Sequence, residues 1–220
     1  GLDCRNPFSG VYLTPETDKQ KRQPFSLDQI KTLQRHCYEK DDDVRWLVAL
    51  ISDTGKRLAE AAGLMMKNLI LDSPHPHVVV TSYPHRSLKT KASERVIPLV
   101  GASLWAAQRL SENNDSDFCL PRYTNKDGCN SNSASGAIVK WVKSIFGDDA
   151  VIHGLRHSFR DRLRAAAVPT ELIDQLRGWS VKTVGQSYGN GYALENLSSW
   201  MDKIVIRQIP LPPESTLIKT

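Results

Sequence analysis

The chain has 220 residues, a formal net charge of +5 at pH 7, and 40% hydrophobic and 24% charged residues. This length allows one or two domains around a buried core, and the basic charge favours an acidic partner such as nucleic acid. No apolar run approaches the ~20 residues of a membrane span, and no signal-peptide pattern opens the chain. Four scattered cysteines without a Cys-x-x-Cys pair argue against a zinc site or a disulfide framework, so we expect a cytoplasmic protein.

The first quarter of the chain changes from an irregular segment to helices. Residues 1–25 carry prolines and charges without periodicity, which predicts an extended arm or linker. Ser26 opens the capping box Ser-Leu-Asp-Gln, and apolar residues then recur at helical spacing. A second helix is expected around 44–51, and a short third one from Arg57 to about Met66.

The middle of the chain contains the only β-like pattern. Val78–Thr81 and Arg95–Leu99 are short and rich in β-branched residues, which predicts two strands, and the nearby prolines limit the sheet to a small one. Residues 112–133 are polar and predict a loop. Helices are expected over 101–110, 134–146, 153–167, 169–176 and 193–207.

The most distinctive stretch for chemistry lies near the C-terminal end. It reads His-Gly-Leu-Arg-His-Ser-Phe over 153–159 and Arg-Gly-Trp-Ser-Val-Lys-Thr-Val-Gly-Gln-Ser-Tyr over 177–188. His153 and Arg156 would share one face of a helix and could hold two oxygens of one phosphate. Tyr188 is the candidate attacking group, with a glycine on either side of its segment.

Two earlier motifs belong to the same pattern. Residues 54–60 read Thr-Gly-Lys-Arg-Leu-Ala-Glu, and Glu60 lies where it could hold the guanidinium of Arg57. Residues 87–99 read as a β-hairpin with two lysines before its second strand. We prefer Lys89 over Lys91 as the lysine that reaches a phosphodiester, because Lys89 directly precedes a threonine.

In this order, the four motifs resemble those of the tyrosine recombinases, the phage integrase family, over roughly residues 24–204. Most members carry His where this chain has Trp179, although some carry Trp. The resemblance implies an α+β fold, mainly α-helical with a small antiparallel β-sheet, whose basic face cups DNA. It also implies a linker or arm over 1–25, a catalytic domain over 26–207 and a tail over 208–220.

The resemblance further implies DNA strand cleavage and rejoining through a 3′-phosphotyrosine, without metal, cofactor or ATP. Tyr188 would attack phosphorus, two arginines would neutralise the nonbridging oxygens, and Lys89 would protonate the departing 5′-oxygen. The histidine would donate to the phosphate or assist proton removal, and the indole would donate one hydrogen bond. The implied catalytic residues are Arg57, Lys89, His153, Arg156, Trp179 and Tyr188, with Glu60 and Lys91 in support.

Several alternatives remain at this stage. Tyr192 is a rival nucleophile four residues after Tyr188, although the glycines at 189 and 191 argue against a continuous helix between them. A type IB topoisomerase uses the same kinds of residue, and a remnant of an integrase would bind DNA without cutting it.

The expected partners follow from the resemblance. They are double-stranded DNA with attachment or recombination sites, and three further copies of the chain in a tetramer on that DNA. Family members place a small clamp domain before the catalytic one, so we expect this chain to be a fragment that is monomeric without DNA. We expect it in the cytoplasm of a bacterial host, at the nucleoid and not at a membrane.

Overall fold

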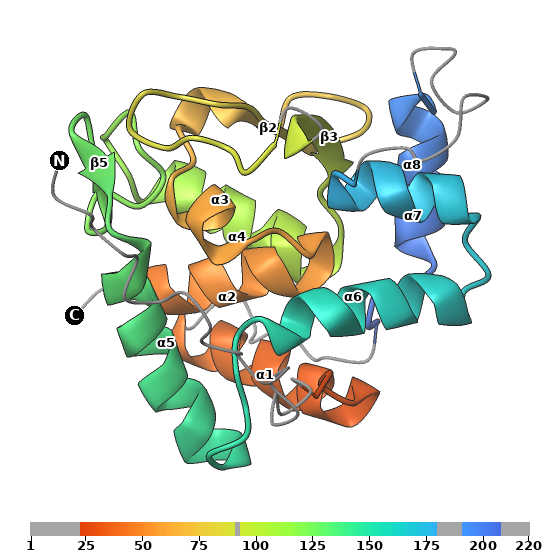
Figure 1. Cartoon of the computed structure of the whole chain (residues 1–220), viewed down its shortest axis with the longest axis horizontal. Coiled ribbons are helices and arrows are strands. Elements are labelled where there is room, and N and C mark those ends of the chain that lie inside the picture. Colours follow the sequence, from red (N-terminus) through yellow and green to blue (C-terminus); the bar gives the residue numbers. More distant parts are fainter. Residues whose placement is uncertain (1–22, 91–92, 180–190, 208–220) are drawn as a thin grey trace, which may run out of the picture.

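The computed structural model describes residues 23–90, 93–179 and 191–207, and these form a mainly helical fold with two small antiparallel sheets (Figure 1). Most of the predicted arm and the predicted tail at 208–220 lie outside the described residues. The helical elements are α1 (Leu27–Lys40), α2 (Asp43–Thr54), α3 (Leu58–Ala62), the 3₁₀ turn η1 (Met66–Asn68), α4 (Gly101–Glu112), α5 (Ser131–Phe146), α6 (Gly154–Ala165), α7 (Thr170–Arg177) and α8 (Leu194–Asp202).

The first helix begins at the capping box that the sequence predicts. The Ser26 hydroxyl accepts a hydrogen bond from the backbone N–H of Gln29 at 3.2 Å, and the Gln29 side chain accepts one from the backbone of Ser26 at 2.8 Å. Asp42 caps α2 in the same way by accepting from the backbone of Arg45 at 3.0 Å. These side chains satisfy backbone donors that a helix start leaves unpaired, which fixes both starting points.

Helix α2 lies at the centre of the fold, with α1, α4 and α6 packed around it (Figure 1). Residues 47–56 are therefore all buried, as expected for a helix covered on every side. Asp53 is fully buried in this helix. Its carboxylate accepts hydrogen bonds from the Gln34 side chain of α1 at 3.0 Å, the backbone of Ala102 in α4 at 2.9 Å and Arg162 of α6 at 2.8 Å. One carboxylate thus joins three helices to the central one.

The predicted strands are confirmed within one residue. The larger sheet has the order β1 (Leu69–Ile70), β2 (His77–Val80) and β3 (Arg95–Pro98), with antiparallel neighbours. The second sheet is a short hairpin of β4 (Thr124–Asn125) and β5 (Gly128–Cys129). It falls inside the segment predicted as a loop, and that prediction is wrong there.

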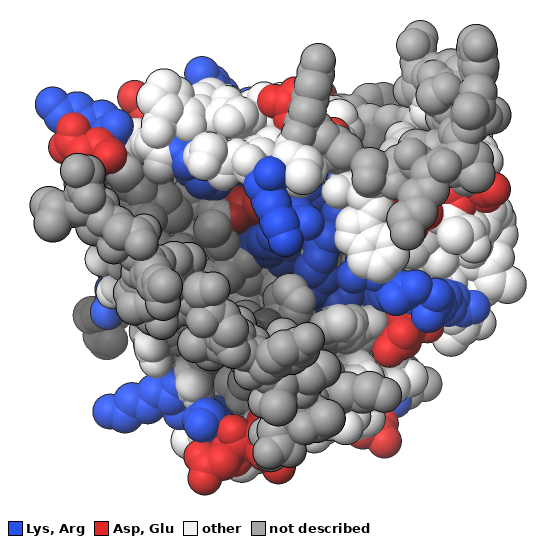
Figure 2. All heavy atoms as spheres, in the orientation of Figure 1, with Lys and Arg blue, Asp and Glu red and all other residues white. Residues whose placement is uncertain are grey.

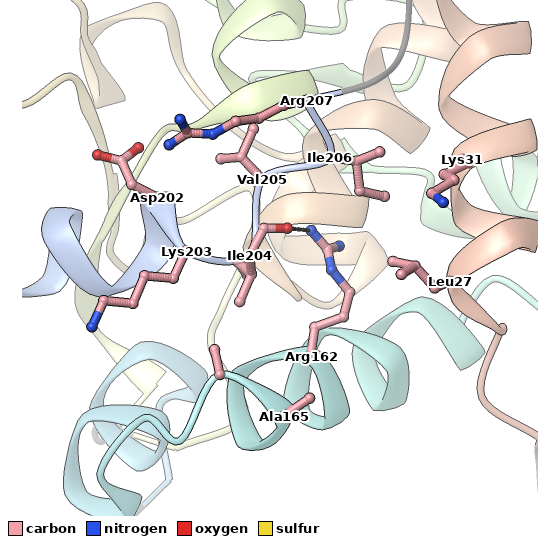
Figure 3. A pocket seen from close by; sticks show the side chains of 11 residues that line it. Leu27, Lys31, Arg162, Ala165, Asp202, Lys203, Ile204, Val205, Ile206 and Arg207 are labelled. Carbon is pink, nitrogen blue, oxygen red and sulfur yellow. Dashed lines mark hydrogen bonds between the residues drawn. The ribbon is translucent and has the colours of Figure 1, made fainter.

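Two helices end earlier than the sequence predicts. Helix α3 stops at Ala62 because the next residues pair with a distant segment, and Leu64 and Met66 exchange backbone hydrogen bonds with residues 117 and 119. Helix α8 stops at Asp202 rather than 207. Beyond that end, Arg162 of α6 donates to the carbonyl of Ile204, and residues 204–207 line an open groove beside α1 (Figure 3).

Within the described residues, no helix is long and apolar enough to cross a membrane. Three cysteines lie among these residues, Cys37, Cys119 and Cys129, and each is a free thiol.

Candidate active site

Arg57 and Glu60 lie together at the start of α3, as the sequence predicts. Gly55 ends α2 in a left-handed conformation with φ 59°, and this turn brings Arg57 to the N-cap position of α3. The Arg57 guanidinium donates to Oε1 of Glu60 at 2.6 Å, and the Arg57 backbone donates to Oε2 at 3.1 Å. The Glu60 side chain is 4% exposed and that of Arg57 is 28% exposed. Glu60 therefore holds a guanidinium that still reaches solvent.

Arg95 is the second partner of Glu60. Its Nη2 donates to Oε2 of Glu60 at 2.8 Å, and its Nε donates to the carbonyl of Leu176 at 2.8 Å. Because Arg95 begins β3, its side chain connects α3, β3 and the end of α7. From the sequence, Arg95 is expected only as part of a strand. A charged residue at the head of an otherwise apolar strand is the signal that could have found it.

The surroundings of Glu60 keep it ionised. Burial alone would raise the pKa of Glu60, but the charge of Arg95 and hydrogen bonds from Arg95 and Arg57 outweigh burial and lower the pKa to about 2. At neutral pH the site therefore contains one fixed negative charge between two arginines.

Arg156 lies in the first turn of α6 and is 3% exposed. Its Nη1 donates to the carbonyl of Gly55, and its Nη2 donates to the carbonyl of Arg177 at 2.6 Å. Those two carbonyls terminate α2 and α7, where the helix dipoles carry partial negative charge that suits a cation. Burial lowers the pKa of Arg156 to about 9, and the charges of Arg57, Arg177 and Arg95 add to that effect. Arg156 thus stays charged at neutral pH in a cationic neighbourhood.

His153 occupies the N-cap position of α6, one turn before Arg156. The carbonyl of His153 accepts a hydrogen bond from the backbone of Arg156 at 3.1 Å, so the predicted helical spacing of the pair is confirmed. The His153 ring is on the exposed side of the site and lies 5.2 Å from the His157 ring, edge to face.

Trp179 follows the tight end of α7. Gly178 adopts φ 63°, and the backbone of Trp179 then donates to the carbonyl of Asp174 at 3.0 Å. The indole is 38% exposed and lies over cations, with Cζ of Arg177 3.9 Å and Cζ of Arg160 5.0 Å from its ring centroid. Arg177 belongs to the 177–188 motif, but the motif alone predicts no role for its side chain.

The remaining predicted residues lie around this cluster or outside the described part of the chain. Lys89 is exposed in the loop between β2 and β3. That loop is anchored by Arg86, whose guanidinium donates to the carbonyl of Thr81 at 2.7 Å and to that of Gly63 at 3.3 Å. Lys91 and Tyr188 lie outside the described residues.

Tyr192, the rival nucleophile, lies in a non-helical segment just before α8 and is 42% exposed. Its backbone N–H donates to Oε1 of Gln175 at 2.9 Å, and its carbonyl accepts from Nε2 of Gln175 at 3.1 Å. These two bonds tie the backbone of Tyr192 to α7.

Lys and Arg side chains gather in a hollow at the middle of one face, over the junction of β3, α6 and α7 (Figure 2). The guanidinium groups of Arg57, Arg95, Arg156 and Arg177 belong to this junction, and the carboxylate of Glu60 is bound by Arg57 and Arg95. Their summed charge is positive in a partly buried site, where charge acts more strongly than in water. Planar N–H donors in this arrangement suit the oxygens of a phosphate.

Within the described residues, no group of three or more His, Cys, Asp or Glu side chains lies where it could hold a metal ion.

Comparison with known proteins gives matches to one family. The model of the phage integrase family matches residues 24–193. Among solved structures, the chain is similar to the integrase from mycobacterium phage Brujita, with 17% identity over 91% of this chain and 63% of that one and a TM-score of 0.62. It is also similar to the Tn1549 transposon integrase in complex with circular intermediate DNA, with 18% identity over 84% of this chain and 66% of that one and a TM-score of 0.58.

A third similar structure is the XerH site-specific recombinase bound to palindromic difH substrate, with 17% identity over 76% of this chain and 48% of that one and a TM-score of 0.51. No curated protein sequence matches the chain. These similarities confirm the predicted fold, that of a tyrosine recombinase catalytic domain. The chain spans roughly half to two thirds of these solved chains.

Proposed function

Because the chain belongs to the phage integrase family, we propose that it is the catalytic part of a site-specific DNA recombinase that cuts and rejoins strands through a 3′-phosphotyrosine. The observation that carries the proposal is that Arg57, bound by Glu60, and Arg156 lie close enough for their charges to interact. Arg57 reaches this point from the turn after α2 and Arg156 from the start of α6, 99 residues further along the chain. Ionisable groups with strongly shifted pKa values, such as Glu60 and Arg156, concentrate at functional sites.

The proposed roles follow from the geometry. A scissile phosphate above the cluster would receive N–H donors from Arg57, which is partly exposed, and from Arg156, which is fixed by two helix ends. These donors would stabilise the extra negative charge that develops on the nonbridging oxygens in the transition state. His153 and Trp179 lie at the rim of the same cluster and would add one hydrogen bond each.

The covalent step balances without a metal or ATP. The Tyr188 oxygen forms a bond to phosphorus, and the bond between phosphorus and the 5′-oxygen breaks. The phenolic proton leaves to His153 or to solvent, and Lys89 gives a proton to the departing 5′-oxygen. Because the phosphotyrosine keeps the energy of the phosphodiester, the reverse reaction with a 5′-hydroxyl reseals the strand.

Double-stranded DNA is the proposed partner. The Tn1549 integrase and XerH structures are complexes with DNA. In this chain, α6 adds Arg160 and Arg164 beyond Arg156 at helical spacing, so a basic stripe leads away from the proposed phosphate site. We further propose a tetramer on two DNA sites during recombination.

Strand exchange tests the function against the topoisomerase alternative. Full-length protein is incubated with two supercoiled plasmids that carry matched recombination sites. Our proposal predicts recombinant product that depends on both sites. Relaxed plasmid without recombinant product would support a nicking-closing enzyme, and bound but unreacted plasmid would support a non-catalytic remnant.

A further inference from the structure

Arg177 lies where three parts of the candidate site meet, and the proposed reaction so far gives it no role. We propose that Arg177 is a positioning residue, whose guanidinium holds the indole of Trp179 against the scissile phosphate while its backbone carbonyl holds Arg156. This inference rests on the proposed function, because it assigns a role within the same reaction. It requires the side-chain contact with the indole to be specific to arginine and the fold to be independent of that contact.

The side chain of Arg177 packs on the indole of Trp179. Its Cζ lies 3.9 Å from the centroid of the Trp179 ring, a distance at which a cation packs directly on an aromatic face. Arg160 approaches the same ring at 5.0 Å and is itself less buried than Arg177. The indole is thus placed by cations that belong to both α6 and α7.

Two nitrogens of the Arg177 guanidinium have no hydrogen-bond partner among the described residues. They are Nε and Nη1, although the residue is only 3% exposed. Buried guanidinium groups in a protein interior are normally paired, because an unpaired donor costs stability. The charge of Arg177 therefore serves a purpose other than hydrogen bonding within the domain.

The backbone of Arg177 binds the side chain of Arg156. Its carbonyl accepts from Nη2 of Arg156 at 2.6 Å, and the next residue, Gly178, turns the chain with φ 63°. A Cβ at Gly178 would lie 3.0 Å from the side chain of Arg95 and from the backbone of Ser93. The turn is therefore tightly fitted. Arg177 contacts Arg156 through its carbonyl and the indole of Trp179 through its side chain, with only Gly178 between residues 177 and 179.

The indole is partly exposed, so its orientation depends on the side chains that pack on it. Trp179 is 38% exposed and directly follows the turn at Gly178. Its N–H is a donor that cannot exchange a proton as imidazole does, so its value to the reaction lies entirely in its orientation. Arginine suits the task because a planar guanidinium can lie flat on an aromatic face, whereas the ammonium of lysine touches the ring as a point charge.

A double-mutant cycle tests the consequence for the reaction. Cleavage of a nicked suicide duplex is measured in a single turnover, with saturating protein, for wild type, Arg177→Lys, Trp179→Phe and the double variant. We expect Arg177→Lys to slow adduct formation roughly 10-fold, because an ammonium cannot replace the flat stacking that orients the indole. In the Trp179→Phe background, which lacks the N–H donor, the same change should have almost no further effect.

Fluorescence tests the contact itself without DNA. The emission of Trp179 is obtained as the difference between matched proteins with Trp and Phe at 179, and its quenching by acrylamide is compared in the Arg177 and Arg177→Met backgrounds. We expect stronger quenching once the guanidinium is removed. Arg35→Met, at an exposed position on α1, serves as the control and should change neither quenching nor the cleavage rate.

The two measurements separate the possible failures. Unchanged quenching in Arg177→Met, or an equal loss of rate in both Trp179 backgrounds, would overturn the inference. If quenching increases in Arg177→Met but wild type forms no adduct, the contact is supported and the proposed function is contradicted instead. A thermal midpoint of Arg177→Lys close to that of wild type is expected, because the fold does not depend on this contact.

Discussion

Glu60 is the residue on which the candidate site depends most. It accepts a hydrogen bond from Arg57 at 2.6 Å and one from Arg95 at 2.8 Å, and it is almost fully buried. Removing its charge would leave two guanidinium groups close together without a counterion. The cost of breaking a buried pair in this way exceeds the net stability that the pair itself provides.

Glu60→Gln is therefore expected to lower the free energy of unfolding by roughly 3 kcal/mol or more, which urea denaturation would measure. Adduct formation should fall as well, because Arg57 loses the partner that orients it. Glu39→Gln, an exposed carboxylate on α1, is the control and should change stability little. A stable Glu60→Gln protein with normal cleavage would contradict this role.

The pH dependence of stability follows from the same residue. Because the pKa of Glu60 is lowered to about 2 in the folded protein, its contribution is fully present above the unfolded-state pKa of roughly 4.3. It is lost as the pH falls through that window toward the folded pKa. Glu60→Gln should lack this component of acid unfolding, so its stability should decline less steeply than that of wild type in that window.

Lys89 is the predicted general acid, and a modified leaving group tests it. Lys89→Ala should cleave ordinary DNA slowly but recover on a duplex with a 5′-bridging sulfur at the scissile position, because a thiolate leaves without a proton. Lys91→Ala is the matched control and should cleave both duplexes like wild type. Recovery by the sulfur substrate in Lys91→Ala, and not in Lys89→Ala, would move the role to Lys91.

The sequence locates the residues that are close to each other in the chain. Arg57 with Glu60, and His153 with Arg156, are separated by three residues, so helical geometry alone predicts their proximity. Helical spacing cannot predict the role of Arg95, because its hydrogen bond to the carbonyl of Leu176 spans 81 residues. Helical spacing does not predict the role of the Arg177 side chain either, since only the folded turn at the end of α7 brings the guanidinium under the indole.

At the scale of elements, the junction between α2 and α6 sets the distance between the two arginines of the site. Gly55 ends α2 with φ 59°, and a Cβ there would lie 2.3 Å from Cδ1 of Phe159. Phe159 is fully buried, so neither partner has room to move. The same glycine presents its carbonyl to Arg156.

Gly55→Ala should therefore destabilise the protein by about 2–4 kcal/mol, combining a left-handed backbone with an overpacked core, and thermal unfolding would show it. Gly136→Ala on α5 is the matched control. Gly136 is exposed within a helix and a Cβ there meets nothing within 4 Å, so the change should stabilise slightly. Equal midpoints for the two variants would contradict the close approach of α2 and α6.

Helix starts were more predictable than helix ends in this chain. Ser26 carries the local signal of a capping box, and α1 begins there. Just beyond the end of α8, Arg162 of α6 reaches the carbonyl of Ile204 (Figure 3). No pattern within α8 contains that information. The hairpin of β4 and β5 was missed for a different reason, because two-residue strands in a polar segment show no periodicity.

At the scale of the whole molecule, the basic hollow and the stripe along α6 predict binding that depends on salt (Figure 2). Affinity for a nonspecific duplex should fall linearly with salt on logarithmic axes, because bound phosphates release counterions. Arg164→Gln should reduce the slope by roughly 1 unit, as measured by fluorescence anisotropy. Arg35→Gln on α1 is the control. An unchanged slope in Arg164→Gln would remove that stripe from the interface.

The whole account depends on whether this chain forms a covalent bond to DNA and through which tyrosine. Tyr188 lies outside the described residues, whereas Tyr192 is tied to α7 through its backbone. Both positions can be tested in one assay with full-length protein on attachment-site DNA, using wild type, Tyr188→Phe and Tyr192→Phe.

We predict a protein–DNA adduct with wild type and Tyr192→Phe and none with Tyr188→Phe. An adduct that survives in Tyr188→Phe and disappears in Tyr192→Phe would move the nucleophile to Tyr192. The absence of any adduct on DNA that all three proteins bind would contradict the proposed recombinase.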